Sequence, residues 1–288
     1  MIEVEGLRYT YAGATDPTLR GLDFAIEEGE IFGFLGPSGS GKSTTQKVLI
    51  GLLPEYAGSV RALGRELRTW GAELYEHIGV SFELPNHYTR LTARENLEHF
   101  ASLYRGPCLD PREVLRWVDL EAHADKRVSD FSKGMKNRLN MARALLHRPK
   151  VLFLDEPTSG LDPVTARAIR ALIQRVRDDG ATVFLTTHDM VTADEVCDRV
   201  AFITAGALRE VGAPADLRKA HGRRTVRVEV RASGGLRTEE FPLDGLADDA
   251  AFQRLLREHP VETIHSQETT LESVFATVTG EPLGAAAA

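Results

Sequence analysis

Short apolar runs separated by helical segments dominate the middle of the chain. Residues 31–35 read Ile-Phe-Gly-Phe-Leu, residues 151–154 read Val-Leu-Phe-Leu, and residues 181–185 read Ala-Thr-Val-Phe-Leu. A strand that is buried on both faces has no polar side, so such runs are typical of parallel sheets covered by helices. A helical segment from Pro163 to Asp179, closed by Gly180, joins the last two runs. The pattern therefore predicts an α/β fold with a parallel sheet.

Two blocks depart from this pattern in the first half of the chain. Alternating runs at Ile2–Val4 and Leu22–Ile26 are broken by turn residues, which predicts antiparallel strands before the first buried strand. Between Leu91 and Leu145, apolar side chains instead recur at helical spacing, as at Leu97 and Phe100. We therefore expect an N-terminal antiparallel β subdomain and a helical subdomain inserted at about residues 84–148.

The pattern changes again beyond about residue 219. Residues 225–230 alternate strictly between polar and apolar side chains, and Gly234-Gly235 follow as a turn signal. Strict alternation predicts strands with one buried face, so we expect a small α+β extension. The predicted domains are residues 1–218 and a C-terminal accessory region at residues 219–288. This region would regulate the protein, dimerise it, or serve only as a stabilising extension.

The composition narrows the class of protein. The chain has 288 residues, of which 42% are hydrophobic and 27% charged, as in ordinary globular proteins. A formal net charge of -7 argues against nonspecific binding of nucleic acid, which depends on Lys and Arg. Two cysteines give no disulfide framework and fit a reducing cytoplasm. No run approaches the ~20 apolar residues of a membrane span, so a membrane role would require a partner protein.

The clearest chemical signal is the segment Gly36–Thr44, which reads GPSGSGKST directly behind the first apolar run. Its glycines leave backbone N–H groups free to converge on phosphate oxygens, and Lys42 adds a positive charge for the outer phosphates. Ser43 offers a hydroxyl to Mg²⁺, and the helix that follows points its positive end at the same place. We expect ATP or GTP to bind this loop, through Gly36, Pro37, Ser38, Gly39, Ser40, Gly41, Lys42, Ser43 and Thr44.

Two further strand ends carry polar residues of the kind that nucleotide hydrolysis needs. Asp155 and Glu156 end the apolar run at 151–154, where Asp155 can reach Mg²⁺ and Glu156 can polarise an attacking water. His188 follows the run at 181–185, from which an imidazole would reach the γ-phosphate. The alternatives are an exposed acidic turn for the carboxylates and a structural role for the histidine. Glu156, His188 and Lys42 are the predicted catalytic residues.

Residues 131–135, Phe-Ser-Lys-Gly-Met, stand where one family has its LSGGQ signature. Together with the preceding motifs, which occur in the same order, they make residues 1 to about 212 resemble the nucleotide-binding subunits of ABC transporters. The resemblance implies an ABC ATPase domain at residues 1–218 with a P-loop NTPase, RecA-like core. It also implies ATP and Mg²⁺ as cofactors, and a head-to-tail dimer of two copies or of similar subunits.

The resemblance implies roles for further residues. Ser132 and Gly134 would hold the γ-phosphate bound to the opposite subunit, although Ser132 can also simply cap a helix. Tyr11 would stack on adenine, with Tyr9 as a competitor, and Asp162 belongs to the loop that crosses the dimer interface. Glu83 departs from the family, where a glutamine reaches Mg²⁺. A carboxylate there still faces the metal in our interpretation, so the predicted metal ligands are Ser43, Asp155 and Glu83.

The purpose of hydrolysis has three candidate answers. We favour the motor of a transporter, held at the inner face of the cell membrane by an integral membrane permease. The permease would dock near Tyr88 and Leu91, whose alternative role is to pack in the core of the helical insert. The alternatives are a soluble ABC ATPase of the DNA-repair or translation kind and a noncatalytic nucleotide sensor. The signature form and the tail from Leu271 to Glu281 resemble drug and antibiotic exporters. We therefore expect export of a hydrophobic compound, ahead of lipid or polysaccharide export and of import.

Overall fold

The computed structural model describes residues 1–222, 225–232, 234–267 and 269–280. Residues 281–288, which include Glu281 of the tail and the end of the predicted accessory region, lie outside the described residues. Internal contacts divide the chain into two compact units, one formed by Met1–Pro214 and one that begins at Ala215. The predicted boundary followed residue 218. Each unit is described by itself below.

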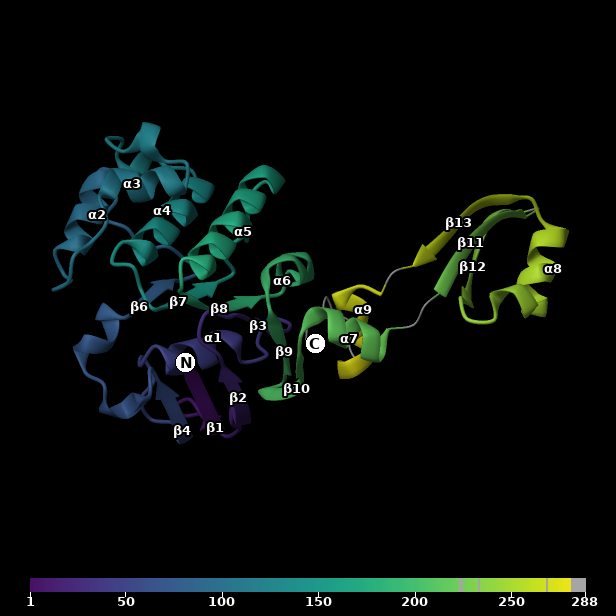
Figure 1. Cartoon of the computed structure of the whole chain (residues 1–288), viewed down its shortest axis with the longest axis horizontal. Coiled ribbons are helices and arrows are strands. Elements are labelled where there is room, and N and C mark those ends of the chain that lie inside the picture. Colours follow the sequence, from purple (N-terminus) through teal and green to yellow (C-terminus); the bar gives the residue numbers. More distant parts are fainter. Residues whose placement is uncertain (223–224, 233, 268, 281–288) are drawn as a thin grey trace. The chain divides into compact units, whose positions relative to one another are not determined.

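A six-stranded sheet forms the centre of the first unit (Figure 1). Its strand order is β10-β9-β3-β8-β7-β6, and only β10 runs antiparallel to its neighbour. Every residue of β3 and β8 is buried, which is why β3 and the middle of β8 read as apolar runs without a polar face. The strands are β3 (Ile31–Leu35), β6 (Ile78–Ser81), β7 (Val151–Asp155), β8 (Thr182–Thr187), β9 (Arg199–Thr204) and β10 (Ala207–Gly212).

A second, antiparallel sheet forms the N-terminal β subdomain. It has the order β2-β1-β4-β5, and its alternating burial matches the alternating sequence pattern. Its apolar face shares one core with the central sheet, where the rings of Phe24 and Phe32 stack 5.7 Å apart. The strands are β1 (Ile2–Tyr9), β2 (Leu19–Ile26), β4 (Ala57–Ala62) and β5 (Arg65–Glu66), and the helix that follows the phosphate loop is α1 (Lys42–Leu49).

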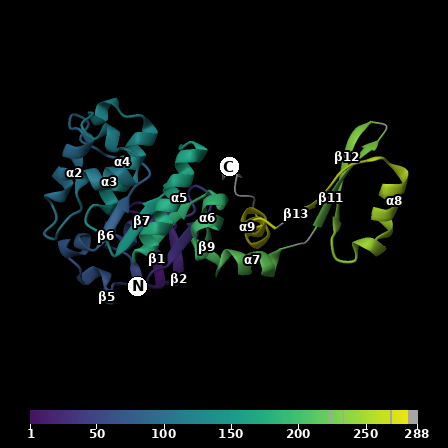
Figure 2. The ribbon, with the colours of Figure 1, turned by 45° about the horizontal axis from the view of Figure 1, so that its top comes forward.

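The helices of the first unit include a cluster inserted between β6 and β7. This cluster consists of α2 (Ala93–Ala101), α3 (Pro111–Trp117) and α4 (Lys133–Leu145), which lie together in both views (Figure 2). A capping box formed by Thr92 and Glu95 begins α2. The remaining helices are α5 (Pro163–Asp178) and α6 (Met190–Val196), with short 3₁₀ turns at Leu67–Thr69, Ala72–Glu76, Glu121–His123 and Val128–Asp130.

The second unit has its own small hydrophobic core. Its sheet has the order β12-β11-β13 with antiparallel pairs, and alternate residues of β11 are buried: Val226, Val228 and Val230. Leu255 packs against them from one helix. The elements are α7 (Pro214–His221), β11 (Thr225–Ala232), β12 (Gly235–Pro242), a 3₁₀ turn at Leu246–Asp248, α8 (Ala250–Glu258), β13 (Val261–Gln267) and α9 (Leu271–Thr279). The predicted α/β fold with a β subdomain, a helical insert and an α+β extension is confirmed.

Candidate active site

The strand order brings three distant parts of the sequence to one edge of the central sheet. β3 lies between β8 and β9, and β7 lies on the other side of β8. All four run parallel, with Leu35 beside Thr187 and Asp155 beside Thr186. The loop after β3, the carboxylates at the end of β7 and the histidine after β8 therefore meet. Ligands of open α/β sheets bind at this carboxyl edge.

A pocket of about 420 Å³ lies at this edge. Most of the predicted site residues line it, and so does Thr18, which the sequence patterns did not indicate because it occupies an unremarkable turn before β2. The lining residues are Thr18, Ser38, Gly39, Gly41, Lys42, Ser43, Thr44, Glu83, Asp155, Glu156 and His188. The size falls within the range of small-molecule sites, roughly 300–1,000 Å³.

The phosphate loop has the shape that its glycines permit. Gly41 has a φ of 111°, a left-handed conformation that L side chains rarely adopt. A Cβ at Gly36 would come within 2.2 Å of the Ile203 carbonyl oxygen, so only glycine fits against β9 there. The Ser40 hydroxyl is buried without a hydrogen-bond partner among the described residues. Such a backbone cradle, with an unsatisfied hydroxyl in it, suits a phosphate group.

Lys42 is the cation of the pocket and is itself buried. Its Nζ donates hydrogen bonds to the carbonyl oxygens of Gly36 at 2.6 Å and Pro37 at 2.9 Å. Burial lowers the pKa of Lys42, and the nearby carboxylates of Glu156, Asp155 and Glu83 act in the opposite direction. The two carbonyl oxygens and the nearby carboxylates thus favour the charged form, which burial disfavours.

The Glu156 carboxylate is held by the strand next to its own. Its Oε1 accepts hydrogen bonds from the His188 backbone N–H at 3.0 Å and from the ring Nδ1 at 2.7 Å. Its Oε2 accepts from the Thr187 hydroxyl at 2.9 Å. The backbone of Glu156 is left-handed, with a φ of 49°, which turns the side chain out of the line of β7. Thr187 is a second residue that the sequence patterns missed.

The chemistry of the pocket also fits a divalent cation, although the donor set is small. The Ser43 hydroxyl and the carboxylates of Asp155 and Glu83 line the same pocket, and Asp155 accepts a short hydrogen bond from Thr186. Among the described residues, no group of three or more His, Cys, Asp or Glu side chains is placed to hold a metal. Mg²⁺ in nucleotide sites takes few protein ligands, because water and phosphate oxygens supply the others.

Several predicted residues lie outside this pocket. Tyr11 is 38% exposed and bonds Thr44 Oγ1 at 3.1 Å, whereas Tyr9 is half-buried and packs on the core. The exposed ring is thus free to meet a base, which favours Tyr11 over its competitor. The other predicted nucleotide-binding residues that do not line the pocket are Gly36, Pro37, Ser40, Ser132, Gly134 and Asp162.

Ser132 and Asp162 both act as helix caps. The Ser132 hydroxyl accepts a hydrogen bond from the Met135 N–H at 3.2 Å and caps the start of α4. The capping role considered for this residue is therefore present. Asp162 accepts two backbone N–H groups at the start of α5, at 3.0 and 3.1 Å. Neither role excludes contact with a nucleotide on a second subunit, because both helix ends remain accessible to solvent.

The segment after Glu83 carries exposed apolar side chains. Leu84 is 78% exposed and Tyr88 is 51% exposed, while Leu91 is half-buried. The Tyr88 ring contacts those of His99 and Phe100 on α2, with centroids 4.8 and 6.0 Å away. An exposed aromatic supported from behind by other rings is typical of a protein contact surface.

Hydrogen bonds tie this segment to α4. Asn140 donates to the Phe82 carbonyl oxygen at 2.7 Å, and Arg143 donates to the Asn86 carbonyl oxygen at 2.9 Å. The ring Nε2 of His87 lies 2.9 Å from the Lys136 carbonyl oxygen. Burial lowers the pKa of His87 to about 4. The helix that starts at Ser132 thus holds the chain that follows Glu83.

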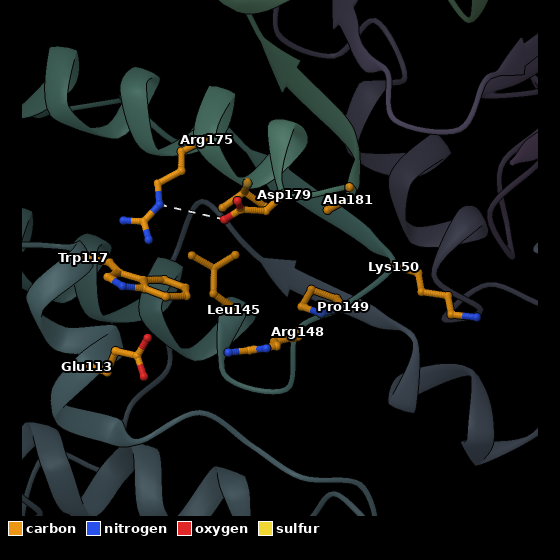
Figure 3. A pocket seen from close by; sticks show the side chains of 11 residues that line it. Glu113, Trp117, Leu145, Arg148, Pro149, Lys150, Arg175, Asp179 and Ala181 are labelled. Carbon is orange, nitrogen blue, oxygen red and sulfur yellow. Dashed lines mark ion pairs between the residues drawn. The ribbon is translucent and has the colours of Figure 1, made fainter.

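Figure 3 shows a larger cavity, of about 580 Å³, with the side chains that line it. Its lining includes Lys150 and Ala181, which precede β7 and β8, so it lies at the opposite edge of the sheet. The Arg175 guanidinium stands over the Trp117 ring, 4.9 Å from its centroid, and joins α5 to α3. Carboxylates and cations both line this cavity, so its charge favours no single class of ligand.

None of the helices in the described part of the chain combines the length and apolar character needed to span a lipid bilayer.

Comparison with known proteins gives consistent results along the whole chain. Residues 19–159 match the family model described as ABC transporter. Residues 224–268 match the model described as fluoroquinolone efflux ABC transporter C-terminal domain. A fluoroquinolones export ATP-binding protein of Mycobacterium tuberculosis is 55% identical over 284 residues, which cover 98% of this chain and 94% of that protein.

More distant relatives and solved structures share the ATP-binding part. A linearmycin resistance ATP-binding protein of Bacillus subtilis is 33% identical and is matched over 81% of this chain and 76% of its own. The solved ATP-binding subunit of an ABC transporter has a TM-score of 0.70 at 29% identity, covering 77% of this chain and 93% of that one. A dimeric ATP-binding cassette bound to ADP and Pi has a TM-score of 0.67, also at 29% identity, covering 74% and 98%.

Proposed function

The chain belongs to the ATP-binding proteins of ABC transporters and hydrolyses ATP, and we propose that it powers export of a fluoroquinolone-like drug through a separate membrane permease. One observation supports this substrate class above all others. The 55% identity to the mycobacterial protein runs through the accessory region, and residues 224–268 match a C-terminal domain named for fluoroquinolone efflux. The match to the linearmycin resistance protein covers less of the chain.

In the proposed reaction, different pocket residues bind the phosphates, hold the metal and orient the water. The loop N–H groups and Lys42 hold the phosphates, and Ser43, Asp155 and Glu83 would hold Mg²⁺, which would neutralise charge on the phosphate oxygens. Glu156 accepts a hydrogen bond from water and directs its oxygen in line with the γ-phosphorus. As that oxygen bonds to phosphorus, the bond to the bridging oxygen breaks, ADP leaves with the electron pair of that bond, and the proton that the water loses passes to Glu156 and from there to solvent. His188 and Lys42 stabilise the charge that develops on the transferred group.

The complete site would require a second subunit. Tyr11 binds the adenine, whereas Ser132 and Gly134 face the nucleotide held by the partner, across an interface that includes Asp162. The partner is a second copy or a similar subunit, arranged head to tail. The dimeric form of a related cassette bound to ADP and Pi supports this arrangement. Ser132 and Gly134 lie outside the chain's own pocket, as residues that act across an interface would.

The permease would bind the segment that follows Glu83. Leu84 and Tyr88 present exposed apolar surface there, and α4 holds the segment from behind. The protein would then lie in the cytoplasm, at the inner face of the membrane. Residues 1–218 would be the ATPase domain, and the accessory region at residues 219–288 would serve this class of exporter.

The test measures drug export with the catalytic glutamate intact and replaced. The chain is expressed with its permease in cells, as the wild type or as Glu156→Gln. The accumulation of norfloxacin, a fluoroquinolone, is then compared between the two kinds of cell. We expect lower accumulation only with the wild type, together with ATPase activity in the purified wild-type complex. ATPase activity without any effect on norfloxacin would favour a lipid or polysaccharide exporter, or a soluble ABC ATPase. No ATPase activity in the complex would contradict the catalytic assignment.

A further inference from the structure

The hydroxyl of Thr187 lies between the catalytic carboxylate and the start of the next helix. Thr187 is completely buried at the end of β8. Its Oγ1 donates to Glu156 Oε2 at 2.9 Å and accepts the Asp189 N–H at 2.9 Å. One O–H can donate only once, so the bond from Asp189 directs the Thr187 proton toward Glu156.

A buried threonine, Thr192, fixes Asp189 in turn, and a second, Thr158, contacts Thr192. The Asp189 carboxylate accepts the N–H of Thr192 at 3.2 Å and its hydroxyl at 2.5 Å. Thr192 Oγ1 also lies 3.3 Å from the hydroxyl of Thr158, which belongs to the loop after Glu156. Thr158 and Thr192 are both buried. Because buried hydroxyls are costly to leave unpaired, this chain of bonds holds one geometry.

The bonds to Glu156 leave one lone pair for water. Each carboxylate oxygen has two lone pairs. Oε1 accepts two hydrogen bonds, both from His188, and Oε2 accepts one, from Thr187. The remaining acceptor site is therefore on Oε2, and the Thr187 bond determines its direction.

We propose that Thr187 is a positioning residue, which orients Glu156 Oε2 so that its remaining lone pair accepts the attacking water. This inference rests on the proposed role of Glu156. Without the hydroxyl, Oε2 loses the one donor that the described residues provide for it, and the carboxylate can turn about its last torsion. The nucleotide contacts through Lys42 and the phosphate loop do not involve Thr187 and would remain.

The test compares ATP hydrolysis by Thr187→Val and Thr187→Ser. Each variant is full-length and is assayed in complex with its permease. We expect kcat of the valine variant to fall about tenfold, the usual loss for a residue that orients a reacting group. The KM for ATP should stay unchanged, and serine should restore kcat. An unchanged kcat in the valine variant would overturn the proposal, as would a serine variant no more active than valine.

A matched control separates positioning from stability. Thr182 is buried at the other end of β8, where its hydroxyl accepts the Gly29 N–H at 2.9 Å, far along the strand from Glu156. Thr182→Val should lower the melting temperature as much as Thr187→Val does, but leave kcat unchanged. If both variants lower kcat in proportion to their melting temperatures, Thr187 has only a structural role and the proposal fails.

A second background shows whether Thr187 acts through Glu156. In Glu156→Gln, the added Thr187→Val change should cause no further loss of kcat, because residues that act as a unit are not additive. A further tenfold loss would overturn the proposal. If Glu156→Gln alone keeps the wild-type kcat, the proposed role of Glu156 fails and this inference fails with it.

Discussion

At the scale of single residues, opposing effects act on the charge of Lys42. Burial disfavours the ammonium, and three carboxylates favour it, in the order Glu156, Asp155 and Glu83. Glu83 stands at the position where the nucleotide-binding subunits that the chain resembles have a neutral glutamine. The pocket thus carries one more negative charge than that family pattern provides, and a divalent cation would offset it.

Replacing Glu83 by glutamine tests this extra charge. We expect Glu83→Gln to raise the Mg²⁺ concentration for half-maximal ATPase severalfold, because one charge near the cation contributes on the order of 1 kcal/mol. The measurement is ATPase activity against free Mg²⁺ at saturating ATP. Glu98→Gln, on exposed α2, is the control and should change nothing. An unaltered Mg²⁺ dependence in Glu83→Gln would remove Glu83 from the metal ligands.

His87 makes the stability of the first unit depend on pH. Burial lowers its pKa from 6.5 to about 4, and the nearby charges of Arg143 and Lys136 act in the same direction. The unfolded chain therefore takes up a proton that the folded chain resists. The stabilisation is complete above pH 6.5 and is lost as the pH falls from 6.5 toward 4.

The predicted loss can be measured by urea unfolding. Between pH 7 and pH 5, the wild type should lose about 2 kcal/mol more unfolding free energy than His87→Gln, which cannot take up the proton. His99→Gln, at an exposed position on α2, should follow the wild type. Equal pH dependence in the wild type and His87→Gln would show that His87 is not the responsible group.

At the scale of elements, α4 joins two regions of the first unit for which we propose contacts with other subunits. It starts at Ser132, in the segment that resembles the family signature, and its later turns bind the chain after Glu83 through Asn140 and Arg143. A helix is stiff over this distance, since its backbone bonds are all internal. A change at the start of α4 would therefore move the segment that carries Tyr88.

Comparing two helix-cap variants distinguishes the capping role of Ser132 from its proposed contact with a nucleotide. Ser132→Ala and Asp110→Ala each remove a cap, at α4 and α3, and each should cost about 1 kcal/mol of stability. Only Ser132→Ala should also lower ATPase activity, by tenfold or more, since Asp110 is far from the signature segment in sequence. Calorimetry and ATPase assays of both variants make the comparison. If Ser132→Ala and Asp110→Ala have equal ATPase activities, Ser132 acts only as a helix cap.

The strands around the site could be predicted because burial on both faces makes a sequence continuously apolar. Residues 31–35 and 151–154 were found in this way, and with them the phosphate loop and the pair Asp155-Glu156. Thr18 and Thr187 were missed, because each gains its role only from tertiary contacts that leave no local pattern. The strand order, which places β3 between β8 and β9, is likewise a property of the whole sheet.

At the scale of the whole molecule, the two units have separate cores. Among the described residues, the core cluster around Phe32 and Phe34 consists of residues from Met1 to Val211, and the core cluster of the second unit is built around Val228 and Leu255. The second core is small, and domains of about 60 residues bury only about 60% of their surface. The first unit therefore has the larger store of hydrophobic stabilisation.

A chain that ends at Pro214 tests the independence of the first unit. We expect its melting temperature to stay within a few degrees of the main transition of the full chain, because the described core cluster around Phe32 lies within the residues that are kept. Basal ATPase activity should also remain. Scanning calorimetry and ATPase assays check this. A truncated chain that fails to fold would show that the accessory region stabilises the first unit.

The position of β3 also has a consequence for how the protein is made. Among the described strands, the partners of β3 are β8 and β9, which end at Thr187 and Thr204, so β3 leaves the ribosome long before either partner exists. At about 5–20 residues per second, this apolar strand waits on the order of ten seconds or more for its neighbours. During synthesis, the segment that leads into the phosphate loop is thus an exposed hydrophobic stretch that chaperones can bind, and the ATP site can form only after Thr204 has been made.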